Sequence, residues 1–363
     1  MRVGILYALG PDTFAAGDSY QEALMQNEEA DRLALDSVLF EEHHGARCCP
    51  AVGSLAAAAA ARTKAIRVGS ANRQLTLEYP ANVAEDFAVA DIISRGRVIL
   101  GVSPGERPEE FRAAGVPWET REARFREAVE IVRTLWTQSN VQFIGEHYRF
   151  PLGVDGESGW RREPFAPPFV DQWRRGQVVP EYLPMLPRPV QLPHPPIWVN
   201  GFRRDTIEWA ASRGLGYLCS SLETDDEVRV KAGWYNDALE AAGRDRNEVE
   251  IALARELFLA EDGAAAREIA LPSLRRHVEA LRAEAGEDNS DLAIMKGLDE
   301  ASLLDTCFLV GSPLEVLDRL KALQADVGVG HLLCRVHLPG RKRLDVVNCI
   351  RLLASQLHTR MVA

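Results

Sequence analysis

Two acids and two histidines stand side by side where an apolar run ends: Glu41, Glu42, His43 and His44. Burying such a cluster is costly unless each group has a partner, whereas a strand end that opens into a cleft tolerates it. A neutral imidazole there could hydrogen-bond a carbonyl, or act as an acid or base near neutral pH. The alternative is that an acid pairs with a neighbouring arginine while the histidines cap a helix or face water. We take His43 and His44 as candidate catalytic residues.

The same cluster does not predict a metal site. Adjacent residues of a strand point to opposite faces, and the Glu-His-His run lacks the helical spacing of the HExxH zinc motif. Residues from other strand ends could still complete a zinc site around these histidines.

A second cluster lies in ILGVSPGERPEEF, residues 99–111, after another apolar run. Ser103 and Gly105 are candidate cofactor-binding residues, because glycine lets a flat ligand or a phosphate approach the backbone. Glu106 is a candidate catalytic base or hydrogen-bond acceptor. The alternative is an ordinary polar loop between a strand and a helix.

A third cluster lies in PPIWVNGFRRDTIEWAASRG, residues 195–214, where a strand ends and a helix begins. Backbone N–H groups at a helix start, together with two cations, form a good anion site. Solvated arginines are the alternative, but cations are unfavourable at a helix start, so an anionic partner such as phosphate is favoured. The candidate phosphate-binding residues are Asn200, Gly201, Arg203, Arg204 and Thr206.

The elements that must position these residues alternate between strands and helices. Strands are predicted at 2–8, 37–41, 66–72, 97–102, 195–201, 215–220, 249–260, 306–311 and 331–338. Helices are predicted at 20–36, 50–62, 80–94, 120–136, 204–213, 225–242, 313–326 and 344–358. Short apolar strands joined by helical crossovers are typical of parallel sheets. An open doubly wound sheet would also fit, but length and about eight βα units favour an α/β fold, a (β/α)8 TIM barrel. The first strand is not followed by GxGxxG, which weakens a dinucleotide-binding alternative.

We expect one domain over residues 1–363, with insertions. Residues 139–149 read as a hairpin around Gly145, and a proline-rich segment, about 150–196, reads as a long loop. Residues 264–303 read as inserted helices. In a parallel barrel the active site lies at the carboxyl ends of the strands, so the three clusters should share one mouth.

Composition excludes some functions. The formal net charge is −11, so nucleic acid and anionic membrane surfaces are not expected partners. The six cysteines form no CxxC pair, and we expect them to be reduced. No apolar run reaches the ~20 residues of a membrane span, and the start lacks the pattern of a signal peptide, so we expect a cytoplasmic location.

Taken in order, these segments resemble the bacterial luciferase-like flavin-dependent monooxygenase family. The resemblance is carried by the Glu-His-His run with the alanine-rich helix after it, by PPIWVNG with TIEWAASRGLG, and by FLVGSPLEVLDRLKAL. It implies a (β/α)8 barrel with a helical lid at about 264–303. It also implies that reduced FMN binds at the barrel mouth and reacts with O2 to transfer an oxygen atom to a small organic substrate.

The resemblance assigns roles to single residues. His43 matches the functional histidine of the family, and Arg203 to Thr206 match its phosphate-binding helix start. The residues expected to contact the flavin ring are those after the third strand: Ser70, Ala71 and Asn72.

The sequence departs from the family pattern at three positions after the fourth strand. Pro104 stands where many members carry arginine, and Ser103 stands where light-emitting members carry a reactive cysteine, so light emission is not implied. Glu106 is similar to the acid of deazaflavin-dependent members, which transfer hydride. Those members usually show Asp-His-Phe instead of Glu-His-His, so a deazaflavin-dependent oxidoreductase is our second hypothesis.

The resemblance also implies partners. FMNH2 would come from a separate NAD(P)H-dependent flavin reductase, since no NAD-binding segment is visible, and the protein would form a homodimer. A non-catalytic flavin-binding protein is the third hypothesis. The sequence does not identify the substrate.

Overall fold

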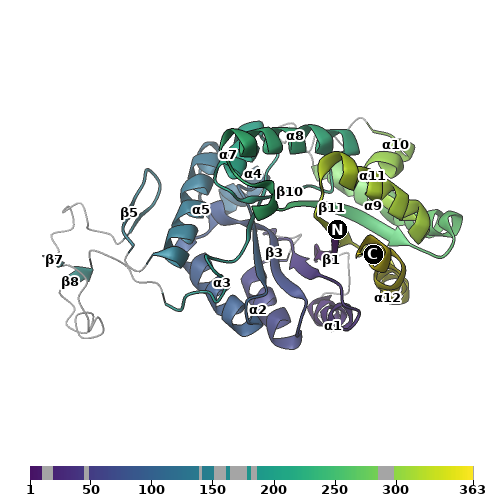
Figure 1. Ribbon diagram of the computed structural model, residues 1–363, viewed down its shortest axis with the longest axis horizontal. Helices are drawn as coiled ribbons and strands as arrows, with labels where there is room; N and C mark the ends of the chain where they lie inside the picture. The colour runs from purple at the N-terminus through teal and green to yellow at the C-terminus, as the bar shows by residue number, and fades with distance from the viewer. Residues whose placement is uncertain are drawn as a thin grey trace.

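Eight parallel strands close into a barrel, which confirms the predicted fold class (Figure 1). The computed structural model describes residues 1–9, 19–44, 49–138, 141–150, 161–163, 178–180, 186–284 and 298–362. In ring order the strands are β1 (Arg2–Tyr7), β2 (Ser37–Phe40), β3 (Arg67–Gln74), β4 (Val98–Ser103), β9 (Ile197–Asn200), β10 (Gly216–Cys219), β11 (Ile251–Leu259) and β13 (His331–Arg335). Pairing of β13 with β1 completes the ring.

Helices cover the outside of the barrel, as the crossover rule requires. They include α1 (Ser19–Arg32), α2 (Val52–Arg62), α3 (Pro80–Ser94), α5 (Arg121–Thr137), α7 (Arg204–Ser212), α8 (Asp225–Ala241), α11 (Pro313–Val327) and α12 (Arg343–Leu352). Capping boxes at Thr224 and Ser312 start α8 and α11. The predicted helix 20–36 ends early, because Ala34 adopts a left-handed conformation that turns the chain into β2.

The barrel interior is apolar in its middle and polar at one end. Its central cluster consists of Leu6, Leu39, Ala71, Ile99, Trp198, Leu218, Ala252, Ala254 and Leu333. Because strand side chains alternate between faces, the next inward position is two residues on. On β9, β11 and β13 that position holds Asn200, Glu256 and Arg335. The carboxyl ends of the strands therefore form a polar mouth over an apolar plug.

Strands β3 and β4 approach closely beneath this mouth. Their pairing shifts register between Ser70 and Arg73, and a Cβ added at Gly101 would lie 2.3 Å from the carbonyl oxygen of Ala71. Glycine is therefore required at position 101, where any side chain would meet the backbone of β3.

The first insertion begins with the predicted hairpin. β5 (Phe143–Ile144) pairs antiparallel with β6 (Arg149–Phe150), and the turn includes Gly145. β7 (Arg161–Glu163) pairs with β8 (Val178–Pro180), and both lie to the side of the barrel beyond α5 (Figure 1). The rest of the predicted loop 150–196, up to residue 185, lies outside the described residues.

One predicted strand, which follows the second insertion, lies outside the barrel ring. Residues 264–303 contain α9 (Gly263–Glu284) and the start of α10 (Glu300–Thr306), while 285–297 lie outside the described residues. The predicted strand 306–311 forms β12 (Leu309–Gly311), but β12 is not a ring strand. β11 is nine residues long, so its first half pairs with β13 and its last three residues pair with β12.

The two ends of the chain meet on the outside of the barrel, where the Met1 amine donates to the Met361 carbonyl at 3.4 Å (Figure 1). Within the described part of the chain, no helix is both long and apolar enough to cross a bilayer.

Candidate active site

His43 lies against an acid and an amide at the barrel mouth. Its Nδ1 is 3.6 Å from Oε1 of Glu110 and 3.4 Å from Nε2 of Gln74. Glu110 belongs to α4 (Pro108–Ala114), a short helix that the sequence analysis did not predict. Burial alone would raise the pKa of Glu110, but contacts with His43, the His44 N–H and Gln74 lower it. The histidine therefore has a buried carboxylate beside it.

Glu42, the second acid of the Glu-Glu-His-His run at 41–44, is wholly buried. Glu42 forms an ion pair with Arg73 at 2.5 Å and accepts from the backbone N–H of Gln74 at 3.0 Å. Burial raises the pKa of Glu42 although Arg73 opposes the shift. His44, Glu42 and Glu78 bring side-chain atoms within 4.8 Å of one another. Because the Arg73 guanidinium already supplies a positive charge to both acids, we assign no metal here.

Glu41, the first acid of the run at 41–44, joins a buried network across the mouth. Arg335 lies between Glu41 and Glu256, and its Nη1 is 2.9 Å from Glu256 Oε1. The same oxygen accepts from Ser221 at 3.0 Å and lies 3.2 Å from Nε2 of His277 on α9. Burial alone would raise the pKa of Glu256, but Arg335 and His277 lower it to about 2. The predicted lid helix thus contacts the mouth through His277.

A small cavity of about 10 Å³ unites the second and third sequence clusters. Its lining is Ser103, Pro104, Gly105, Glu106, Glu122, Asn200, Phe202 and Arg203. Burial raises the pKa of Glu106, with partial opposition from His43 and Arg107. Glu106 forms no hydrogen bond or ion pair with another described side chain. It is therefore available to a ligand and lies close enough to His43 to sense its charge.

The predicted phosphate site at the start of α7 already holds a carboxylate. No side chain caps this helix, but Thr206 Oγ1 donates to Glu122 at 2.6 Å. Arg203 is half exposed, lies 3.1 Å from Asp205 and lies 3.9 Å from the same Glu122. Arg204 is more exposed and pairs along the helix with Glu208. Arg203 and Thr206 therefore converge, whereas Arg204 turns away along the surface.

The predicted flavin-ring residues are buried in β3. Ser70 donates to the carbonyl of Gly101 at 2.8 Å, and Asn72 Oδ1 accepts from the backbone N–H of Glu42 at 2.8 Å. Ala71 belongs to the central apolar cluster. Their side chains hold neighbouring strands together in this structure. Gly201 lies at the end of β9, where a Cβ would approach Thr206 Cγ2 at 3.0 Å.

Sequence reasoning missed several polar residues of the mouth, among them Glu110, Glu122, Glu256 and Arg335. A charged residue inside an otherwise apolar strand was a usable signal for Glu256 in IALARELFLA and for Arg335 in HLLCRVHL. Glu110 and Glu122 lie on helices that pack beside the mouth, and nothing in their local sequence distinguishes them from solvent-facing acids.

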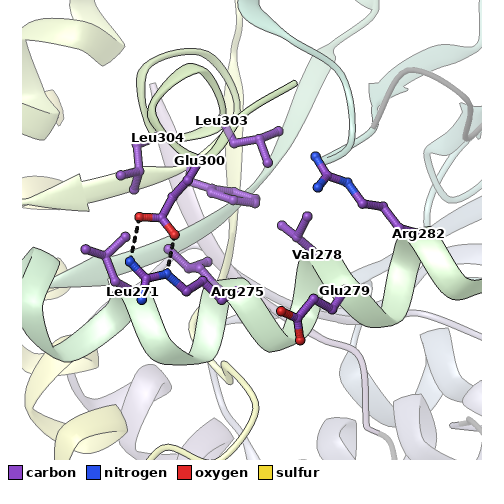
Figure 2. Close-up of a pocket in the computed structure, with 10 residues that line it drawn as sticks. Leu271, Arg275, Val278, Glu279, Arg282, Glu300, Leu303 and Leu304 are labelled. Carbon is purple, nitrogen blue, oxygen red and sulfur yellow. Dashed lines mark hydrogen bonds and ion pairs between the residues drawn. The ribbon is translucent and has the colours of Figure 1, made fainter. Parts of the chain in front are cut away.

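A larger pocket of about 100 Å³ lies away from the predicted site, between α9 and α10 (Figure 2). Leucine and valine side chains line it, and an ion pair between Arg275 and Glu300 crosses it, with Nη2 to Oε1 at 3.0 Å. None of the sequence-predicted site residues lines this pocket.

Comparison with known proteins identifies the family. Residues 1–330 match the family model described as luciferase-like monooxygenase. An F420-dependent glucose-6-phosphate dehydrogenase of Amycolatopsis mediterranei is 33% identical over 50% of this chain and 54% of its own length. The oxygenase component of a flavin-dependent trigonelline monooxygenase of Acinetobacter baylyi is 26% identical over 67% of this chain and 60% of that protein. The chain thus spans only about half to three fifths of these two curated relatives.

A solved structure matches from end to end. The monooxygenase RslO1 of Streptomyces bottropensis superposes with a TM-score of 0.80 at 27% identity, over 99% of this chain and 100% of that chain. The family match covers most of the chain and agrees with the closed barrel and its polar mouth. This chain belongs to the luciferase-like monooxygenase family.

Proposed function

We propose that this protein is the oxygenase of a two-component system, which uses reduced FMN and O2 to oxygenate a small organic substrate. The observation that supports FMN is the end-to-end similarity to a monooxygenase at 27% identity, whereas solved F420-dependent enzymes match end to end at only 16–17% identity. The intact Glu-His-His run at the mouth agrees with this choice. FMNH2 would be supplied by a separate NAD(P)H-dependent flavin reductase.

The residues at the start of α7 fit a phosphate group. The uncapped helix offers backbone N–H groups, Thr206 offers a hydroxyl, and Arg203 offers a half-exposed guanidinium. Glu122 now accepts the hydrogen bond of Thr206, so it must turn away or share this donor when a phosphate binds. Bound flavin would supply the reaction with O2, and Arg203 with Thr206 would hold its phosphate tail.

Two side chains of the mouth could move protons. His43 and Glu106 come from different loops, and the charge of His43 lowers the pKa of Glu106 against the effect of burial. In our proposal His43 takes up or returns a proton, and Glu106 gives the cavity a carboxyl group that stays protonated to higher pH than usual. The apolar plug beneath the mouth helps to exclude water from the reacting groups.

Glu106 is also the specific observation that favours the second candidate, a deazaflavin-dependent oxidoreductase. A partly buried acid with a raised pKa beside a hydride acceptor can return a proton to it or take one from an alcohol. F420-dependent glucose-6-phosphate dehydrogenases of Amycolatopsis mediterranei and Kineococcus radiotolerans support this reading over 54% and 70% of their lengths.

The deciding experiment is an anaerobic titration of the purified protein with FMNH2 and, separately, with reduced deazaflavin F420. We expect tighter binding of FMNH2, followed by incorporation of ¹⁸O from labelled O2 into a ketone, aldehyde or sulfonate from a substrate panel. Tighter deazaflavin binding with hydride transfer to an alcohol would replace our proposal by the second candidate. Flavin binding without any turnover would favour a storage protein. His43→Ala should keep the fold and lower turnover.

We also propose a homodimer that buries the outer face of α3. Val89, Ile92 and Ile93 on this helix are each more than 40% exposed, an apolar stripe that water disfavours. Ile92→Glu should shift the mass measured by light scattering toward that of a monomer. Val230→Glu, at an exposed apolar position on α8, is the matched control and should not change the mass.

A further inference from the structure

The edge of the His43 ring that carries Nδ1 is enclosed by polar neighbours. Gln74 Nε2 lies 3.4 Å from this nitrogen and Glu110 Oε1 lies 3.6 Å from it. Only 15% of the His43 side chain is exposed. A neutral imidazole carries one hydrogen, on either Nδ1 or Nε2, and its neighbours determine which nitrogen keeps it.

The side-chain amide of Gln74 has too few hydrogens to donate to all of its neighbours. Its amide nitrogen has two hydrogens and three neighbouring acceptors. Glu110 Oε2 at 2.5 Å and the Glu42 carbonyl at 3.2 Å are both nearer than the His43 nitrogen. Reversing the amide would turn its oxygen toward the Glu110 carboxylate, and two acceptors would then face each other. The two hydrogens of Gln74 are therefore used without His43.

Glu110 then fixes the histidine. Its side chain is 4% exposed, and the backbone N–H of His44 donates to its carboxylate at 2.9 Å. Contacts with His43, His44 and Gln74 lower the pKa of Glu110 against the effect of burial, so it is ionised near neutral pH and can only accept. At 3.6 Å this carboxylate therefore favours a hydrogen on the nitrogen that faces it, Nδ1.

We propose that Glu110 is a positioning residue that holds neutral His43 as its Nδ1–H tautomer and leaves Nε2 as a hydrogen-bond acceptor for the mouth. Its importance for turnover rests on the proposed function, but the tautomer itself does not. Neutral His43 then recognises a donor, such as a hydroxyl or N–H group of the substrate or the cofactor. It cannot donate to a carbonyl, as the sequence analysis allowed, unless a second proton is bound.

The charged groups around His43 are acidic on both sides. Glu110 faces it from α4. Glu106 lies in the loop before that helix, where the charge of Arg107 lowers the pKa of Glu106 against the effect of burial. A proton that arrives at Nε2 would give a doubly protonated ring whose Nδ1 lies 3.6 Å from the Glu110 carboxylate. The same geometry therefore suits a residue that accepts a proton at Nε2 and later returns it.

The test is ¹⁵N NMR of protein labelled at histidine, with the His43 signals assigned by their loss in His43→Ala. In the wild-type protein without cofactor we expect a protonated Nδ1 and an unprotonated Nε2 for the neutral ring. In Glu110→Gln we expect a mixture with the Nε2–H tautomer. Glu110→Asp keeps the charge and should keep the wild-type tautomer. Glu109→Gln, at an exposed neighbouring position, is the matched control and should change nothing.

The outcomes separate this inference from the proposed function. A wild-type ring protonated at Nε2, or an unchanged tautomer in a folded Glu110→Gln variant, would overturn the inference whatever the protein catalyses. If the Glu110 variants fail to fold, the wild-type spectrum still decides. A wild-type Nδ1–H ring in a protein that never turns over FMNH2 would uphold the inference and refute the proposed function. If both hold, Glu110→Gln should lower kcat at least tenfold with a smaller change in KM.

Discussion

Glu256 provides a stability test whose size follows from the structure. The residue is wholly buried, and its side-chain partners among the described residues, Arg335, His277 and Ser221, all lie at one oxygen, Oε1. The pKa of Glu256 falls from 4.5 to about 2 because Arg335 and His277 outweigh its burial. A lowering of this size corresponds to about 3 kcal/mol of folding free energy at neutral pH.

The sign of this contribution fixes its pH dependence. Because the folded-state pKa of Glu256 lies below the unfolded value, the stabilisation is complete above about pH 5 and is lost as the pH falls toward 2. Within the described residues, replacing Glu256 by glutamine leaves Arg335 with Glu41 as its one ion-pair partner, and breaking a buried ion pair typically costs about 3–5 kcal/mol. We expect Glu256→Gln to lose about 3 kcal/mol at pH 7 but only about 1 kcal/mol at pH 3.

The assay is urea unfolding followed by circular dichroism at both pH values. The difference between wild type and variant isolates Glu256, since other acids titrate in both proteins. Glu261→Gln, an exposed position just beyond β11, is the control and should change stability by less than about 0.5 kcal/mol. A loss in Glu256→Gln that stays constant between pH 7 and pH 3 would show that the ionised carboxylate is not what stabilises the mouth.

Two further predictions use other parts of the barrel. Glu122→Gln removes a negative charge beside Arg203 and should tighten FMN binding several-fold by calorimetry; weaker binding would mean that Glu122 orients the donors of the site. Gly101→Ala places a Cβ 2.3 Å from the Ala71 carbonyl, so a lower melting temperature or insoluble protein is expected. Gly233→Ala, where a Cβ meets nothing within 4 Å in a helix, should instead stabilise the protein by about 0.5–1 kcal/mol; equal effects at the two glycines would contradict this account.

The fold was predictable because its signals are local. An apolar run, or a proline or capping residue at a helix start, can be recognised from about ten consecutive residues, as at Pro80 and Ser312. Whether a strand belongs to the barrel ring cannot be predicted from its local sequence. The segment around Leu309 reads as a strand like the others, yet it lies outside the ring because β11 extends past its partner β13. Only the pairing of segments far apart in sequence decides that outcome.

The candidate site was predictable only where polar residues follow strands directly. Ser103, Asn200 and Arg203 were found this way and share one cavity in the structure. Glu122 was not, because it reaches the start of α7 from a helix that lies 84 residues earlier in the chain. The composition of α5 gives no reason to separate this acid from its solvent-facing neighbours. The roles of these residues stay predictions.

The distribution of charge in the mouth gives the proposed cofactor one orientation. Arg335 is buried between Glu41 and Glu256, so these two carboxylates already neutralise its charge and it does not attract a further anion. Arg203 is half exposed and pairs with Asp205 at the surface, where an ion pair contributes about 0–1 kcal/mol and is readily exchanged. An anionic tail is therefore attracted to the α7 side and repelled by the acids near β11 and β13. In the proposed function, the neutral end of the ligand would then face Glu106 and His43, the two residues proposed to move protons.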